Sequence, residues 1–122
     1  MNLRNDFYTV KEKTVVENKV SAIIELNATH KIYEGHFPGQ PIVPGVCQMQ
    51  ILKEFLEEVT GKKLQSGNGD NIKFTGMIIP DKSPLVNMEM TYQDKEGLLA
   101  MDAKFFSGET VFTKYKGKFK AI

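Results

Sequence analysis

A short segment rich in glycine and proline carries the histidine whose surroundings best suit chemistry. Residues Glu34 to Val46 read Glu-Gly-His-Phe-Pro-Gly-Gln-Pro-Ile-Val-Pro-Gly-Val, so His36 lies among three glycines and three prolines. Glycine permits tight turns and proline fixes its backbone φ, which together hold such a segment still at low entropic cost. An imidazole titrates near neutral pH, and the segment leads into a helix N-terminus that favours negative charge. This pattern predicts acid–base chemistry on a carbonyl compound.

The element that must position this segment is a helix over residues Val46 to Thr60. Apolar residues recur there at the i, i+3, i+4 spacing of a buried helical face, and they are Met49, Leu52, Phe55, Leu56 and Val59. Val46, Cys47 and Ile51 widen the apolar surface in the first half, which predicts burial on most sides. Gly61 suits the left-handed position that ends a helix.

The remaining residues follow the two-residue period of β-strands. Val20, Ala22, Ile24 and Leu26 mark one face of the strand from Lys19 to Leu26. Further strands are predicted over Phe7–Val16, Ile72–Ile79, Leu85–Tyr92, Leu99–Phe105 and Thr110–Lys120, with turns at Asn68–Asp70, Asp94–Gly97 and Ser107–Glu109. Ile32 and Tyr33 are expected to form a short extended bridge. One helix beside antiparallel strands predicts an α+β fold, with a curved sheet around a central helix.

Composition limits the classes of function. The 122 residues are enough for one domain, residues 1–122, with a real core, and the hydrophobic fraction of 41% is ordinary. A net charge of +1 argues against nucleic acid as the main partner. The single cysteine favours a reducing compartment, and neither a signal peptide nor a membrane span is recognisable, so a cytoplasmic protein is expected.

The motif His36-Phe37-Pro38-Gly39, followed by Pro41 and Pro44-Gly45-Val46, resembles the active-site segment of the hot-dog-fold beta-hydroxyacyl-[acyl carrier protein] dehydratases. The resemblance continues in Lys19–Leu26 and Ile72–Pro80. It implies a hot-dog fold and dehydration of a 3-hydroxyacyl thioester to the trans-2-enoyl thioester in fatty acid, polyene or related lipid synthesis. It also implies a substrate carried on acyl carrier protein or coenzyme A, no cofactor, and a homodimer or a hexamer.

The resemblance assigns roles to individual residues. His36 is the base that removes a proton from C2, the backbone N–H near Gly45 and Val46 binds the thioester oxygen, and Phe37 joins the substrate-binding set. In the family, an acidic residue on the helix fourteen positions after the histidine, from the other subunit, completes the site, and that position is Gln50 here. A carboxamide can orient the leaving hydroxyl but cannot deliver a proton.

Three functions therefore remain open from the sequence. The chain could be a dehydratase that uses water or another residue as acid, an enzyme of other thioester chemistry such as hydrolysis, or an acyl-carrier-binding module without turnover. Glu54, one helical turn beyond Gln50, is the nearest carboxylate that could replace the acid or contact substrate, and the alternative is a solvated side chain.

Other candidate residues have plainer interpretations. His30 is expected to be an exposed turn residue and Cys47 a core residue, and no set of residues has metal-ligand spacing. Lysines alternate along the last strand and therefore share one face; they are Lys114, Lys116, Lys118 and Lys120. This face is either a solvated or edge-protecting surface, or a binding surface for an acidic acyl carrier protein. Flexible methionines could pack in the core or line an acyl tunnel, namely Met77, Met88 and Met90.

Overall fold

All six strands belong to one antiparallel sheet. A computed structural model describes residues 2–35 and 39–122, with the backbone alone at residues 66–70. The sheet has the order β1-β2-β4-β5-β6-β3, with β3 and β1 at its two edges. The strands are β1 (Tyr8–Val16), β2 (Lys19–Leu26), β3 (Leu64–Phe74), β4 (Leu85–Lys95), β5 (Leu98–Ser107) and β6 (Thr110–Ala121). Two helices, α1 (Ile32–Gly35) and α2 (Gly45–Thr60), complete the chain.

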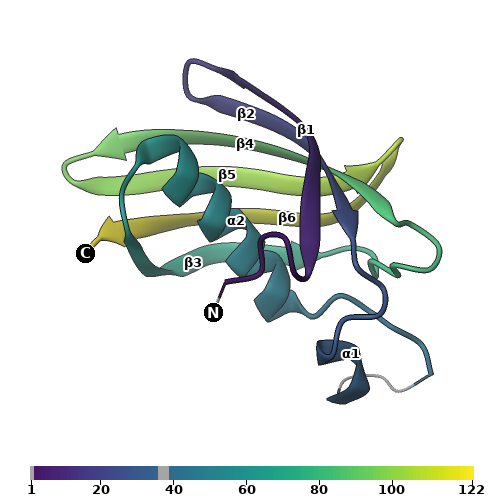
Figure 1. Ribbon diagram of the computed structural model, residues 1–122. Helices are drawn as coiled ribbons and strands as arrows, with labels where there is room; N and C mark the ends of the chain where they lie inside the picture. The colour runs from purple at the N-terminus through teal and green to yellow at the C-terminus, as the bar shows by residue number, and fades with distance from the viewer. Residues whose placement is uncertain (1, 36–38) are drawn as a thin grey trace.

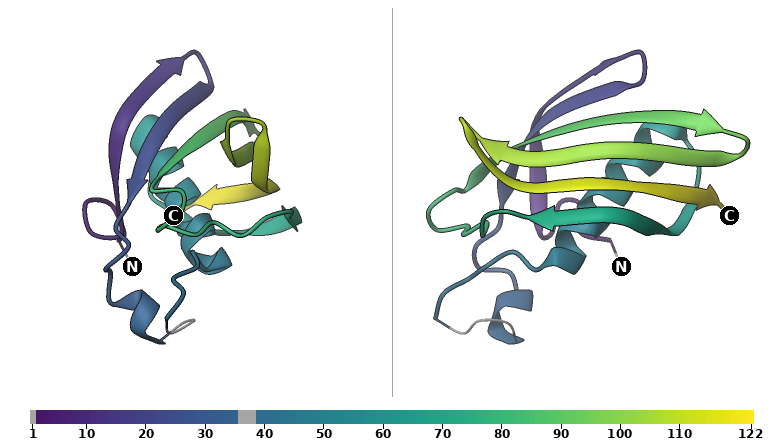
Figure 2. Two further views of the ribbon diagram at one scale, coloured as in Figure 1. Left: turned by 90° about the vertical axis from the view of Figure 1, so that its right-hand side faces the viewer. Right: turned by 180° about the vertical axis from the view of Figure 1, so that it is seen from behind.

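The sheet curls around α2, which lies across its inner face (Figures 1 and 2). The predicted alternation is confirmed on three strands, because the buried residues are Val20, Ala22, Ile24 and Leu26 on β2, Val86, Met88 and Met90 on β4, and Leu99, Met101, Ala103 and Phe105 on β5. The helix buries Cys47, Gln48, Ile51, Leu52, Phe55 and Leu56 against them. This is the curved sheet around one long helix that the sequence predicts.

The termini of α2 follow from its flanking residues. Pro44 precedes the first turn with extended backbone angles, φ −64° and ψ 149°, as suits a residue just outside a helix. Gly61 ends the helix in the left-handed region at φ 69°, and its N–H bonds the carbonyl of Glu57 at 2.9 Å. The predicted end at Thr60 is confirmed, and the helix begins at Gly45, one residue before the predicted start.

The predicted turn at Asn68–Asp70 is wrong, because the backbone there continues as part of β3. Pairing with β6 accommodates the turn-forming residues as two register shifts, one between Gln65 and Asn68 and one between Gly69 and Asn71. The sheet ladder thus overrides a local preference. The strand predicted over Ile72–Ile79 ends early, at Phe74.

The expected extended bridge at Ile32 and Tyr33 is also wrong, because these residues begin α1. Backbone hydrogen bonds between residues three positions apart close this short helix. The Tyr33 N–H donates to the His30 carbonyl at 3.1 Å, and the Glu34 N–H donates to the Lys31 carbonyl at 3.0 Å. Tyr33 is buried, and its ring centre lies 5.5 Å from that of Phe7. Burial of this aromatic ring therefore favours the helical turn.

Candidate active site

The glycine- and proline-rich segment delivers the chain to the first turn of α2. His36 and Phe37 lie outside the described residues. Beyond them, the buried Val43 donates its N–H to the Ile78 carbonyl at 2.9 Å, which ties the segment to the core. Pro44 provides no side-chain oxygen to cap the helix, and the first turn of α2 contains no acidic residue. The positive end of the helix dipole is therefore not neutralised by the first turn's own side chains.

The ring of Phe74, from β3, lies directly over Gly45. A Cβ atom added to Gly45 would sit 2.8 Å from Phe74 Cζ, so any larger residue would require this ring to move. Phe74 is 55% exposed, and the neighbouring Val46 is 70% exposed. The prediction that Val46 is buried is wrong, since its side chain lies outside the contact between helix and sheet. The two residues expected to bind the thioester oxygen, Gly45 and Val46, thus lie at a helix end bordered by apolar, accessible side chains.

Gln48 is a buried polar residue that the sequence analysis did not single out. Its side chain accepts a hydrogen bond from the Thr113 hydroxyl on β6 and donates one to the Val43 carbonyl at 3.4 Å. Gln48 and Thr113 are both buried. These bonds fix the first turn of α2 against the sheet. The signal was present in the sequence, since Gln48 shares the helical face of Ile51, Leu52 and Phe55 and is polar where they are apolar.

Gln50 and Glu54 lie side by side on α2, and Glu54 holds the N-terminal segment. The Gln50 Nε2 donates to Glu54 Oε2 at 2.9 Å. The same carboxylate accepts the N–H groups of Leu3 at 2.7 Å and Arg4 at 2.9 Å, and the Tyr8 hydroxyl at 3.0 Å. Glu54 is half-buried, so the solvated alternative is wrong. It serves as a structural acceptor at the position where a replacement acid was considered.

Tyr33 places a buried hydroxyl close before the histidine segment. No hydrogen-bond partner for this hydroxyl occurs among the described residues. Burial, then the nearby Cys47 and Asp81, raise its pKa far above the usual value, so the phenol is neutral. Cys47 is fully buried, as predicted, and burial also raises the pKa of its thiol. Both groups are therefore uncharged at neutral pH.

His30 is largely covered, so the prediction of an exposed turn residue is wrong. Its side chain is 13% exposed, and Nε2 lies 2.9 Å from an Asp6 carboxylate oxygen. The ring also accepts the Ile32 N–H at Nδ1, at 3.0 Å, and meets Phe7 edge to face. These contacts occupy both ring nitrogens in holding α1 against the start of β1.

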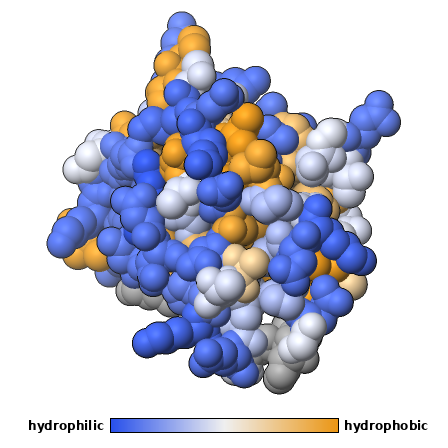
Figure 3. Space-filling model, turned by 45° about the vertical axis from the view of Figure 1, so that its right-hand side comes forward, coloured by the Kyte–Doolittle hydropathy of each residue, from blue (hydrophilic) through white to orange (hydrophobic). Residues whose placement is uncertain are grey.

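The methionines divide between core and surface. Met88 and Met90 are buried on the inner face of β4, whereas Met77 is 64% exposed. Figure 3 shows that apolar areas interrupt the hydrophilic surface on the face it presents. Near the start of α2 and the adjoining edge strand, the exposed apolar residues are Val46, Ile72, Phe74 and Met77.

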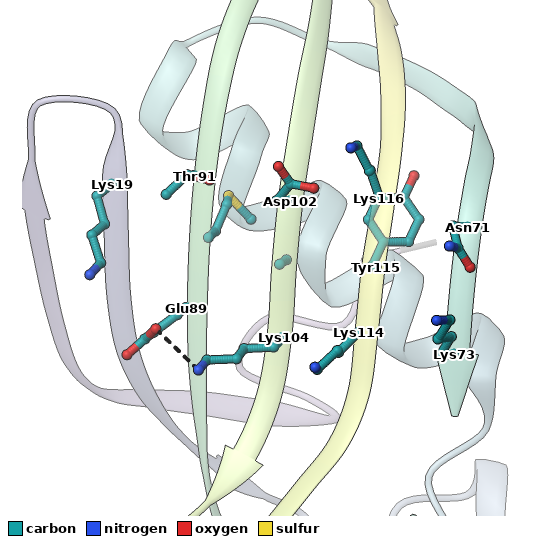
Figure 4. A pocket seen from close by; sticks show the side chains of 12 residues that line it. Lys19, Asn71, Lys73, Glu89, Thr91, Asp102, Lys104, Lys114, Tyr115 and Lys116 are labelled. Atoms are coloured by element: carbon teal, nitrogen blue, oxygen red, sulfur yellow. Dashed lines mark ion pairs between the residues drawn. The ribbon is translucent and has the colours of Figure 1, made fainter. Parts of the chain in front are cut away.

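A hollow of about 370 Å³ lies on the outer face of the sheet, opposite α2 (Figure 4). Its charged lining consists of five lysines and two carboxylates, namely Lys19, Lys73, Lys104, Lys114, Lys116, Glu89 and Asp102. All four predicted lysines of β6 are exposed. They do not protect an edge, because β6 lies between β5 and β3. Gly45, Val46, Gln50 and Glu54, the predicted site residues that the structure describes, do not line this hollow.

No helix within residues 2–35 or 39–122 is long and apolar enough to cross a membrane. In the same part of the chain, no group of three or more His, Cys, Asp or Glu side chains could hold a metal ion.

Comparison with known proteins places the chain among dehydratases. Residues 12–112 match the ApeI-like family of ApeI dehydratases. The 3-hydroxyacyl-[acyl-carrier-protein] dehydratase FabZ of Lactococcus lactis subsp. lactis is 31% identical over 109 residues, which cover 81% of this chain and 70% of that protein. The FabZ of Rhizorhabdus wittichii is 26% identical over 108 residues, covering 80% of this chain and 68% of that protein.

A solved structure supports the fold independently. The dehydratase heterocomplex ApeI:P from Xenorhabdus doucetiae matches with a TM-score of 0.70 over 91% of this chain and 96% of that chain. The sequence identity is 18%, so this structural similarity is evidence for the fold alone. The hot-dog arrangement expected from the sequence is confirmed.

Proposed function

Because the chain belongs to the ApeI-like dehydratase family, we propose that His36, Gly45 and Gln50 form its catalytic site. Its reaction is the dehydration of a 3-hydroxyacyl thioester to the enoyl thioester, in fatty acid or related lipid synthesis. The observation that carries the assignment of Gly45 is the start of α2 directly behind the histidine segment, without a side-chain cap and without an acid in its first turn.

The proposed chemistry begins with proton removal from C2 of the substrate. His36 takes the proton, and the electron pair moves toward the thioester oxygen, where the Gly45 N–H stabilises the developing negative charge. One fixed donor of this kind contributes about 2.7–4 kcal/mol in other enzymes. The electrons then return to form the C2–C3 double bond as the C3–O bond breaks. The departing hydroxide takes a proton from water or from the His36 imidazolium, because Gln50 has no proton to give.

The test is a direct assay of purified protein with 3-hydroxyacyl thioesters of several chain lengths. Formation of the enoyl thioester is followed by its absorbance, and free thiol is measured in parallel. We expect enoyl product without thiol release, and loss of that product in His36→Ala. Thiol release alone would identify a hydrolase, and carrier binding with neither product would identify a binding module. Either result would refute the proposal.

We further propose that an acidic acyl carrier protein binds the outer face of the sheet, at the lysines that line the hollow there. Lys114 lies directly opposite Lys104 on one neighbouring strand and Lys73 on the other. Like charges opposite one another on neighbouring strands are unfavourable, and Lys104 has an ion-pair partner in Glu89 at 3.7 Å. A partner with acidic side chains would relieve this repulsion, which supports the proposal by charge complementarity.

Two charge-reversed variants test this binding surface. Lys114→Glu with Lys116→Glu should raise KM for a carrier-bound substrate and weaken its salt dependence, because the reversed charges repel an acidic partner. The same variant should leave KM for a short synthetic thioester unchanged. The matched control is Lys11→Glu with Lys82→Glu, which changes net charge equally at exposed positions away from the hollow. Equal carrier KM values in the two variants would contradict the proposal.

A homodimer, or a hexamer of such dimers, is proposed as the working assembly, in the cytoplasm. The apolar residues exposed beside the edge strand β3 support it, since Ile72, Phe74 and Val46 are 39%, 55% and 70% exposed. Exposed apolar patches of this kind commonly mark protein interfaces. Sedimentation equilibrium should give a multiple of the 13.8 kDa chain mass, and Phe74→Glu should shift the protein toward monomer. A wild-type monomer at assay concentration would refute this assembly.

A further inference from the structure

Glu54 connects the N-terminal segment of the chain to the proposed catalytic position. On one side it accepts hydrogen bonds from the N–H groups of Leu3 and Arg4 and from the Tyr8 hydroxyl. On the other side it accepts the Nε2 of Gln50 at 2.9 Å. The two functions of this carboxylate, anchoring and contact with residue 50, depend on the same two oxygens.

Within residues 2–35 and 39–122, four hydrogen bonds reach the Glu54 carboxylate, and it is the acceptor in each. Oε1 receives Arg4 N–H and the Tyr8 hydroxyl, and Oε2 receives Leu3 N–H and Gln50 Nε2. An ionised carboxylate has acceptor sites only, about four in all. Glu54 can therefore face the amino end of the Gln50 carboxamide and not its oxygen, because two opposed oxygens would repel one another. The Glu54 contact thus selects which end of the Gln50 carboxamide faces residue 54.

We propose that Glu54 is a positioning residue that holds the Gln50 nitrogen toward its own carboxylate, so that the carboxamide oxygen accepts a hydrogen bond from the substrate's 3-hydroxyl. This inference rests on the proposed function, because it assumes that Gln50 meets that hydroxyl. Gln50 then holds the hydroxyl in place through its oxygen and does not assist its departure. Position 50 is a glutamine and not an acid, so its role depends on which end of the carboxamide Glu54 leaves for the substrate.

The surroundings of Glu54 provide a matched control. Arg4 contributes a backbone N–H to Glu54, while its guanidinium pairs with Glu58 at 2.6 Å, one helical turn further along. Lys13 of β1 also pairs with Glu58. Tyr8 faces Glu54 through its hydroxyl, and burial, then the charge of Glu54, raise the pKa of that phenol. Glu58 thus also holds the N-terminal region, but its recorded partners are Arg4 and Lys13.

The kinetic test compares Glu54→Gln with Glu58→Gln. A glutamine at position 54 presents an N–H as well as an oxygen, so this contact no longer selects the amino end of the Gln50 carboxamide. We expect KM for the 3-hydroxyacyl thioester to rise about fivefold, the loss of one ordinary hydrogen bond. The inhibition constant of the saturated acyl thioester, which lacks the hydroxyl, should not change, and Glu58→Gln should change neither constant. Equal losses for both ligands in Glu54→Gln would overturn the proposal.

A spectroscopic test does not depend on activity. In the ¹⁵N-labelled wild-type protein, the side-chain amide pair of Gln50 is identified by its absence in Gln50→Glu. We expect this pair to move to a different chemical shift in Glu54→Gln, because its contact with the carboxylate is lost, and to keep its wild-type shift in Glu58→Gln. A Gln50 pair with the same shift in all three proteins overturns the positioning role, and Glu54→Asp replaces Glu54→Gln if the latter does not fold. A pair that moves only in the position-54 variant, in a protein without dehydratase activity, would refute the proposed function alone.

Discussion

Replacing Gly45 with alanine tests the proposed oxygen-binding position. The new methyl group would lie 2.8 Å from Phe74 Cζ, so the ring must retreat by about 0.6 Å to reach ordinary contact at 3.4 Å. Cζ is the far end of a side chain that is 55% exposed, so the ring can swing toward solvent. Alanine also suits a helix better than glycine, by up to about 1 kcal/mol. We therefore expect the free energy of unfolding to change by less than about 1 kcal/mol.

Activity should respond much more strongly than stability. The methyl group and the displaced ring would crowd the space beside the Gly45 N–H, where the thioester oxygen is proposed to bind. A loss of half of one donor's contribution, about 1.4–2 kcal/mol, lowers kcat/KM by about 10- to 30-fold. The measurements are enoyl absorbance for the rate and urea unfolding for stability.

A double variant separates crowding from other effects of the substitution. Gly45→Ala with Phe74→Leu removes the ring that the methyl group meets, so it should recover part of the lost kcat/KM. The proposal fails if Gly45→Ala retains its activity within twofold. It also fails if stability falls in parallel with activity, because the substitution would then act through the fold.

Three further predictions concern groups outside the proposed chemistry. Tyr33→Phe removes a buried hydroxyl that has no partner among the described residues, so urea unfolding should show equal or greater stability; a loss above 1 kcal/mol would reveal a hidden partner. The Cys47 thiol should resist alkylation in the folded protein and react after unfolding, because it is buried and neutral; rapid labelling of the native state would contradict this. Burial raises the pKa of Glu58, but Lys13 and Arg4 outweigh it and lower the pKa below 4.5. The contribution of Glu58 to the free energy of unfolding is therefore complete above the pKa that Glu58 has in the unfolded chain. It disappears as pH falls through the lower pKa of the folded state. Glu58→Gln should therefore flatten the dependence of stability on pH in that acid range.

The sequence predicts the parts of the fold that depend on short-range patterns. The alternation of β2 and the apolar face of α2 match the structure because each reflects one buried side of one element. Gly61 also ends its helix as expected, because a left-handed φ is a local requirement. The candidate positions on α2 follow from the motif and its spacing.

The errors arise where distant residues decide the local structure. Asn68–Asp70 remains in a strand because β6 pairs with it, and His30 is covered because Asp6 and Phe7 pack against it. Glu54 is anchored by Leu3, fifty-one positions earlier in the chain. No periodicity within α2 contains that information.

The strand order has a consequence for the chain as the ribosome makes it. β1 and β2 are neighbours in sequence and can form a hairpin early, but the next strand of the sheet is β4, with Val20 opposite Met90. The edge of β2 that pairs with β4 therefore emerges long before its partner strand has been synthesised. Long-range pairing of this kind slows folding. During translation this edge of β2 remains unpaired while α2 is made, so slower elongation after α2 would prolong its exposure.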